Sequence, residues 1–357
     1  MSDGRRPSPT VISDADFIRK VLIALGIVLV VLVLWQLSGV LLLAFGAILV
    51  AIILHALADA LVRYLHVPPR WSLTLASVLI LSLFIGLLAL FGTQIRTQLS
   101  DVIERLPQAI DNFSQTLGLG RVSDDISTML DAETAGGLAS RLAGIGGTIL
   151  GGLADFALVV VAGLYIAASP RIYIEGAIKL FPERHHERVR SSLHASGEAL
   201  KLWLMAQLIA MTCVGLLSTL AFWWIGLPYP YALGLIAGLV DFIPFLGPIL
   251  GALPAVMIAF TVEGNAALWT IFAVFVIQQI EGNVIFPLAA RRLVSIPAAL
   301  ALFAIVAGSI LFGTFGLIFG FPLAVVTYVL VKKLYVRETL GEDTPIPGET
   351  EPSDRTS

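Results

Sequence analysis

The chain has 357 residues, of which 57% are hydrophobic and only 13% are charged. Soluble chains carry about 25% charged residues, so this composition excludes an ordinary soluble protein and predicts a polytopic membrane protein. The single cysteine, Cys213, excludes an internal disulfide and a cysteine-rich metal site in this sequence. The net charge of −3 does not predict orientation, because that depends on where Lys and Arg lie.

The first apolar stretch, residues 21–62, is about twice the ~20 residues that one membrane span requires. We expect it to break at 35–39 and to form a helical hairpin. It is longer than the core of a signal peptide, so we interpret it as retained membrane helix. His55, Asp59 and Arg63 recur at helical spacing near its end, which favours a polar cluster at the membrane interface.

A third span is expected at about 71–92, followed by a polar stretch at 94–148. Apolar residues recur in that stretch at helical spacing, which predicts an amphipathic helical segment outside the bilayer core. Residues 144–152 (GIGGTILGG) then open a fourth span that ends near Ala168. They do not fit GxGxxG and no strand is predicted before them, so a nucleotide site is not indicated.

Residues 169–201 are hydrophilic, and we expect them to form a solvated helical segment. The tripeptide at 185–187 (HHE) does not make HExxH, because position 190 is Arg, so a zinc site is not indicated there. A fifth span follows at about 202–225, and it carries one polar amide, Gln207.

Residues 226–260 are apolar but badly suited to one straight span, because Asp241 lies in their middle. A carboxylate in hydrocarbon is costly and usually faces a partner or a water-filled cavity. Interrupted apolar segments beside a buried charge are typical of transport sites. We therefore expect a broken hairpin with Asp241 at its tip. The alternative role of this carboxylate is to cap the second arm. The predicted breaks of this hairpin are Pro244, Gly247 and Pro248.

The next span, at 267–287, carries most of the other polar side chains of the apolar region. Gln278 and Glu281 share one helix face at i, i+3, and Gln279 and Asn283 share another at i, i+4. Carboxylates with neighbouring amides can bind a cation, take up protons or hydrogen-bond a polyol-like solute. The predicted substrate or ion pathway consists of Asp241, Gln207, Gln278, Gln279, Glu281 and Asn283.

Residues 298–331 are continuously uncharged and long enough for a second hairpin. We expect its breaks at Gly313 and Gly316. The Pro/Glu/Thr-rich end of the chain is expected to be disordered.

An alternative role for Glu281, on the span at 267–287, is an interfacial ion pair with Arg291 or Arg292.

The positive-inside rule predicts the orientation of these elements. The expected cytoplasmic segments hold eighteen of the 22 Lys and Arg residues, and the other four lie in 94–148, which is then external. Segments 226–260 and 298–331 must each enter and leave the membrane on one side, as re-entrant or tilted hairpins. Ordinary spans with an asymmetric charge distribution remain the alternative. The cytoplasmic segments are 1–20, 63–70, 169–201, 288–297 and 332–357.

The two hairpins also match each other in sequence. Pro228 precedes Gly247 by the same 19 residues by which Pro297 precedes Gly316, and GPILGALPAV parallels GLIFGFPLAV. Each hairpin follows a span that carries glutamine. Because the charges predict opposite orientations, these units form an inverted repeat, the arrangement with which many secondary transporters build a midplane site.

The predicted fold is all-α: a polytopic membrane protein with about six full spans plus two broken hairpins in an inverted repeat. There is no GxxxxGK[ST] sequence, no metal-ligand cluster and no serine/histidine/acid grouping. We therefore predict no enzyme activity, no cofactor and no nucleic-acid partner. The predicted parts are a cytoplasmic N-terminus (1–20), N-terminal membrane helices (21–93), an external segment (94–148), a membrane helix (149–168), a cytoplasmic segment (169–201), a transport core (202–331, with repeats 202–260 and 267–331) and a cytoplasmic tail (332–357).

Three segments, in this order, resemble the autoinducer-2 exporter family of bacterial permeases: GLPYPYALGLIAGLVDFIPFLGPILGALPAV, QQIEGNVIFPLAARRLVSIPAAL and LFGTFGLIFGFPLAVV. Ser169 departs from the pattern, because many relatives carry an acid there. The resemblance implies a multi-pass protein of the bacterial cytoplasmic membrane, and the charge distribution predicts that both termini are cytoplasmic. It also implies export of a small polar solute and assembly into homo-oligomers, as pentamers. Some relatives are associated with sodium(lithium)/proton exchange.

Three functions are therefore compared: gradient-driven export of a small polar solute, cation/proton antiport through Asp241 and Glu281, and a non-transporting membrane scaffold. The partners expected for the first two are membrane lipid with a small polar solute or a cation and proton.

Overall fold

The computed structural model describes residues 14–82, 85–86, 151–152, 154–262, 264–289, 296–342 and 344. Within these ranges the chain is helical and contains no strand. Five of the described helices are long and apolar enough to cross a membrane. A sixth is added if Ala154–Ala168 and Pro170–Lys179, which meet at 88°, count as one span. The all-α, multi-pass prediction is confirmed, and the segment at 94–148 lies outside the described residues.

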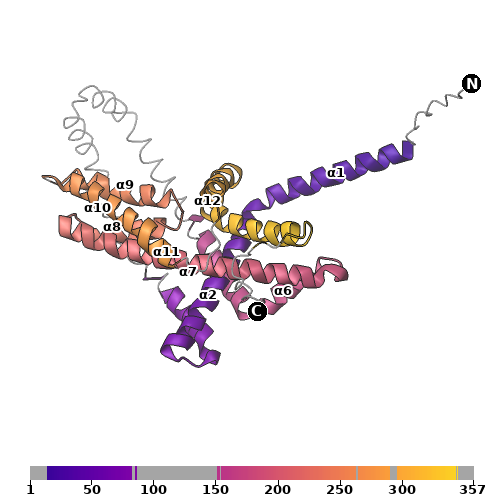
Figure 1. The fold of residues 1–357 in the computed structure, drawn as a ribbon, viewed down its shortest axis with the longest axis horizontal. Coiled ribbons are helices and arrows are strands. Elements are labelled where there is room, and N and C mark those ends of the chain that lie inside the picture. The colour runs from indigo at the N-terminus through magenta and orange to yellow at the C-terminus, as the bar shows by residue number, and fades with distance from the viewer. Residues whose placement is uncertain are drawn as a thin grey trace, which may run out of the picture.

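The first apolar stretch forms two helices, α1 (Asp14–Gln36) and α2 (Ser38–Leu65). The break is at Leu37, inside the predicted interval, but backbone hydrogen bonds continue across it: Leu37 donates to Val33 and Leu41 donates to Leu37, both at 2.9 Å. The chain therefore bends instead of reversing, and α1 projects away from the other helices (Figure 1). The predicted hairpin was wrong, because a reversal needs a loop of two or more residues.

Helix α2 packs against two neighbours, the helix at 69–82 and the helix Ala154–Ala168. A buried apolar cluster joins them and includes Leu54, Ala76 and Ala167. The approach is close at Gly163, where an added Cβ would lie 2.7 Å from Cβ of Val50. Small residues at such contacts allow membrane helices to approach.

After α6 (Pro170–Lys179) and the 3₁₀ turn η1 (Glu183–His185), helix α7 (His186–Ile225) runs for 40 residues. At 1.5 Å per residue its length is about 60 Å. No proline interrupts it, and it ends at Gly226, whose φ of 84° suits glycine. The second half of the hydrophilic segment predicted at 169–201 is thus joined to the fifth span within one helix.

The first hairpin consists of α8 (Pro230–Val240) and α9 (Gly247–Ala259). Its two arms touch at Gly251, where an added Cβ would lie 3.0 Å from Cα of Ala237. Pro248 occupies the first turn of α9, where its missing N–H leaves no helical hydrogen bond unmade. The tip between the arms contains Pro244, so the structure has its turn where the prolines and glycines favour one.

The chain continues through α10 (Ala266–Ile280), a π-helical turn η2 (Glu281–Ile285) and α11 (Phe286–Ala289). Helix α12 (Ala298–Leu330) follows and leads into a second π-helical segment, η3 (Val331–Arg337). α12 is two helices joined at Gly313, where φ is 61° and ψ is −138°. Only glycine adopts such a conformation readily.

The two parts of α12 form the second hairpin. An added Cβ at Gly308 would lie 2.7 Å from the carbonyl oxygen of Gly316, and one at Gly320 would lie 3.0 Å from that of Ala304. Residue 308 faces residue 316, and the earlier residue 304 faces the later residue 320. The two arms are therefore antiparallel on either side of Gly313. The glycines Gly316 and Gly320 therefore hold the arms together.

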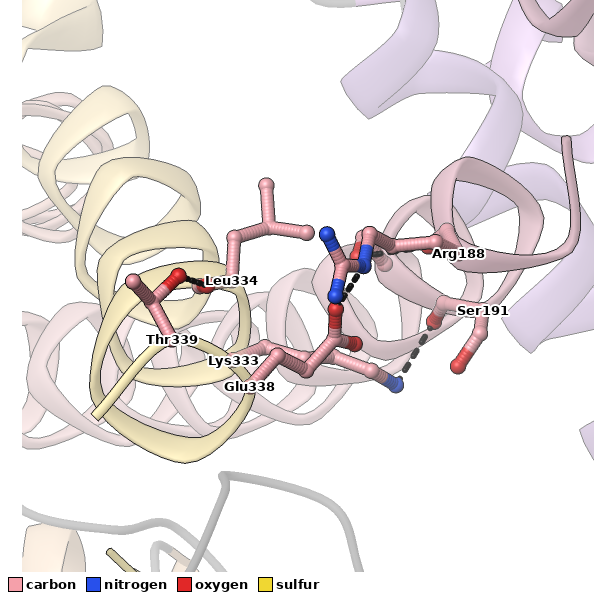
Figure 2. Close-up of polar contacts among 7 residues, drawn as sticks. Arg188, Ser191, Lys333, Leu334, Glu338 and Thr339 are labelled. Carbon is pink, nitrogen blue, oxygen red and sulfur yellow. Dashed lines mark hydrogen bonds and ion pairs between the residues drawn. The ribbon is translucent and has the colours of Figure 1, made fainter. Parts of the chain in front are cut away.

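Helix α7 is the element on which both hairpins pack. Toward its C-terminal end, Phe222 packs with Leu233 of α8 and Ala255 of α9. Nearer its N-terminal end, Trp203 and Leu204 pack with α2 and with the second arm of α12. The N-terminal part of α7 also contacts η3 (Figure 2): Lys333 Nζ donates to the carbonyl of Ser191 at 3.0 Å, and Arg188 pairs with Glu338.

Candidate functional site

Asp241 is the residue that ends α8, at the tip of the first hairpin. Only 2% of its surface is exposed. Gln207 of α7 donates from Nε2 to its backbone carbonyl at 2.7 Å, which ties the tip to α7. The side-chain oxygen Oδ2 is buried and has no hydrogen-bond partner among the described residues. Because such groups are costly to bury unsatisfied, this oxygen is available to a ligand, water or proton.

The capping alternative for Asp241 is contradicted. Helix α9 begins after Leu246, and no side chain caps its N-terminus. Pro248 in its first turn has no N–H to cap.

Gln278 and Glu281 lie on the inner side of the neighbouring span. Gln278, Ser218 and Pro248 line a small pocket between α7, α9 and α10. Its volume of ≈ 10 Å³ is about what one water molecule requires. Gln278 and Glu281 are both half-buried on one face of this span. Their elements, α10 and η2, contact α7, as does α8, which leads into Asp241.

Gln279 and Asn283 do not join this group. Both are exposed on another face of the span. The Asn283 side chain donates from Nδ2 to the backbone carbonyl of Gln279 at 2.9 Å. The sequence correctly separated the two faces, but it did not show which face turns inward.

The π-helical turn at Glu281–Ile285 was not predicted from the sequence. It includes the residues EGN and begins two residues after Gln279. An added Cβ at Gly282 would meet nothing within 4 Å, so this turn is not held by close packing there. Single π-helical turns within α-helices occur frequently at functional sites. The glycine between two polar residues was the available signal.

Trp203 is a second feature that sequence reasoning missed. It lies one helical turn before Gln207 on α7, and only 2% of its surface is exposed. Its ring centroid lies 5.8 Å from that of Phe242, next to Asp241, and 5.2 Å from that of Phe321 in the second arm of α12. Trp203 thus lies between the two hairpins. Its i, i+4 spacing to Gln207 was the signal that could have found it.

The second hairpin supplies a different environment. A groove of ≈ 430 Å³ follows α12, and its lining is apolar except for Thr327 and Tyr328. Gly313 and Gly316 lie at and just after the bend of α12. In α12 no residue carries a charge, whereas the first hairpin has the buried Asp241 at its tip.

The sequence model of the family described as "AI-2E family transporter" matches residues 23–335 of this chain. This match includes both hairpins, α7 and every candidate site residue. The chain belongs to this family.

Two curated relatives of this AI-2E family transporter come from Bacillus subtilis (strain 168). The protein named "Putative transport protein YrrI" is 27% identical over 250 residues, which are 66% of this chain and 69% of the relative. "Putative transport protein YueF" is 27% identical over 290 residues, which are 74% of this chain and 76% of the relative. Both names describe transport and give no substrate.

The polar cluster predicted at the end of the second span has a different partner in this AI-2E transporter. Asp59 pairs with Lys201 of α7, with Nζ and Oδ2 2.8 Å apart. Arg63 instead lies near the ring of Tyr64, and His55 Nδ1 lies 3.0 Å from the carbonyl of Ala51. Asp59 is thus joined to α7, which passes close to α2, and the interfacial position of these residues stays a prediction.

Two further predictions concern partners of the acidic residues. Arg291 and Arg292, the alternative partners of Glu281, lie outside the described residues. Within the described ranges no group of three or more His, Cys, Asp or Glu residues could hold a metal ion.

Proposed function

We propose that this AI-2E transporter is a secondary transporter that exports a small polar solute, similar to autoinducer-2, across the bacterial cytoplasmic membrane. The observation that carries the proposal is the Asp241 carboxylate. It is buried at the tip of a broken hairpin and one of its oxygens has no partner among the described residues. Intramembrane acids in such positions usually line a transport pathway.

The proposed pathway combines this acid with amides from two helices. Gln207 donates to the tip from α7, and Gln278 with Glu281 lie on α10 and η2, which also contact α7. We place Gln279 and Asn283 at an outer, exposed part of the pathway. Such a set offers donors and acceptors to hydroxyl and carbonyl groups, which suits a polyol-like solute.

Alternating access would follow from movement of the two hairpins against α7. The proposed inverted repeat comprises 202–260 and 267–331, and its matched glycines both lie at arm contacts: Gly251 against Ala237, and Gly320 against Ala304. Two hairpins that oppose each other across the membrane would open the site to one side at a time. Export requires the open side to alternate in response to a gradient.

The topology has a separate test. A reporter fused after Gly264 should be external, because the first hairpin would enter and leave the membrane from outside, and fusions to both termini should report the cytoplasm. A cytoplasmic reporter after Gly264 would contradict the re-entrant hairpin and the inverted repeat.

Sodium(lithium)/proton antiport is the second candidate. The observation that favours it is the presence of two acids in the apolar region, the buried Asp241 and the half-buried Glu281, on segments that contact α7, because paired acids can exchange a proton for a cation. If the protein is an antiporter, Asp241 takes part in ion binding and no organic solute is transported.

The two transport functions are separated in proteoliposomes. Wild type and Asp241→Asn are tested for saturable flux of labelled autoinducer-2 and, with an internal pH dye, for proton movement after sodium or lithium pulses. Solute flux that the variant loses supports the exporter, whereas cation-dependent proton flux that it loses supports antiport. Asp59→Asn is the matched control, because it changes an exposed acid outside the hairpins.

Silence of folded wild type in both assays would overturn both transport proposals. The third hypothesis, a non-transporting membrane scaffold, would then remain. It predicts that Asp241→Asn and Glu281→Gln leave the function in cells unchanged. We also propose that the transporter assembles as a homo-oligomer, as a pentamer, in the lipid bilayer. The mass of the complex extracted from membranes tests this stoichiometry, and a monomer at that stage would contradict it.

A further inference from the structure

A buried aromatic contact joins α7 to both hairpins. The indole of Trp203 packs against Phe242 at the first tip and against Phe321 in the second arm of α12. One turn further along α7, Gln207 donates to the backbone of Asp241. A movement of either hairpin relative to α7 would therefore change the surroundings of this indole.

The indole nitrogen is also unsatisfied. Nε1 of Trp203 is buried and has no hydrogen-bond partner among the described residues, as is true of Oδ2 of Asp241. A buried indole N–H usually finds an acceptor, and native proteins leave few buried polar groups unpaired. Here an unpaired donor and an unpaired acceptor lie on two neighbouring elements, α7 and the first tip, that Gln207 holds together.

We propose that Trp203 is a solute-binding residue whose N–H donates to a hydroxyl or carbonyl oxygen of the transported molecule, while Oδ2 of Asp241 accepts from a hydroxyl of the same molecule. This inference rests on the function proposed above and narrows its substrate class. Binding of the solute between the hairpins would satisfy both groups together.

The donor chemistry of the indole favours an organic solute over a bare cation. The indole nitrogen is a donor only, so it cannot ligate sodium or lithium through a lone pair. A donor and an acceptor together suit a molecule that carries both an acceptor oxygen and a hydroxyl. The ligand class is therefore a small uncharged solute with hydroxyl groups.

The test is transport of labelled autoinducer-2 into proteoliposomes by wild type and Trp203→Phe. Phenylalanine keeps an aromatic ring against Phe242 and Phe321 and removes the N–H. Loss of one neutral hydrogen bond should raise KM about fivefold with little change in the maximal rate. Trp224→Phe is the matched control, because Trp224 lies on the same helix with 82% of its surface exposed; its KM should equal that of wild type.

A second readout separates binding from a structural role. The wild type should favour autoinducer-2 over a deoxy analogue, and Trp203→Phe should lose much of this preference. A general packing defect would weaken transport of both molecules equally. Equal KM values and equal preference in wild type and Trp203→Phe would overturn the inference while leaving the exporter proposal intact.

Two other outcomes also bear on the role of Trp203. If wild type moves no labelled autoinducer-2, the proposed solute function fails and the inference falls with it. If Trp203→Phe does not fold, 3-benzothienylalanine is placed at position 203 by codon reassignment, because it keeps the bicyclic shape and replaces only the N–H by sulfur. An unchanged KM in that protein overturns the inference, and a raised KM with reduced preference supports it.

Discussion

The two hairpins have similar arms and different tips. In the first, six residues separate α8 from α9, and they include Asp241 and Pro244. In the second, the single residue Gly313 makes the bend and no charge is present. In both, glycines bring the arms together. Close arms therefore require only small residues, whereas the longer tip adds a place for polar chemistry. In the proposed function, the first hairpin accordingly binds the solute and the second supports or gates it.

The strongest way to test this division is to separate the arms of the second hairpin. An added Cβ at Gly316 would overlap the carbonyl of Gly308, so Gly316→Leu should cost about 3 kcal/mol or more and abolish folded protein. Thermal unfolding and size-exclusion profiles in detergent measure this. Gly39→Leu is the control, because nothing lies within 4 Å of its added Cβ. A normally folded Gly316→Leu protein would contradict the close hairpin.

The equivalence of the hairpins is tested by a matched pair, Gly251→Leu and Gly320→Leu. Their added Cβ atoms lie equally close, 3.0 Å, to the opposite arm. Each substitution should lower the free energy of unfolding by about 1–3 kcal/mol, and the two losses should be similar. Denaturation of the two proteins under one detergent condition gives the comparison. A large loss in one and none in the other would show that the hairpins are not structurally equivalent.

The bend of the second hairpin is expected to depend on backbone conformation alone. No atom lies within 4 Å of an added Cβ at Gly313, but its φ is 61°. Gly313→Ala should therefore destabilise by about 1–2 kcal/mol through strain and not through a clash. Melting temperatures of Gly313→Ala and Gly39→Ala provide the measurement and its control. An increase in stability would mean that the bend is made elsewhere.

The smallest effect is expected where the contact touches neither hairpin. Lys201 and Asp59 join α7 to α2, and Asp59 is largely exposed, so Lys201→Met should cost at most about 1 kcal/mol. Solute flux by the folded protein should not change. Strong loss of flux with normal stability would show that the hairpins depend on this ion pair, and the functional division would have to be extended to α2.

The elements that the sequence predicted well are those with local causes. Pro244, Gly247 and Pro248 lie at the turn of the first hairpin because proline lacks an N–H and fixes φ. Gly313 bends the second because its φ is positive. Asp241 was singled out by being an acid in an apolar stretch, and the structure buries it. The hairpin at 35–39 failed because Leu37 carries no such backbone constraint and the helical hydrogen bonds continue.

The sequence by itself determined the membrane class, the helical content and the position of the two broken segments, because composition and backbone preference act within a few residues. Only the tertiary structure decided that Lys201 pairs with Asp59, 142 residues away, that Gln207 holds the first tip, and that Trp203 lies between the hairpins. Helix periodicity shows which residues share a face, but packing of whole helices decides what that face meets. The partners of a buried polar group therefore depend on the complete fold.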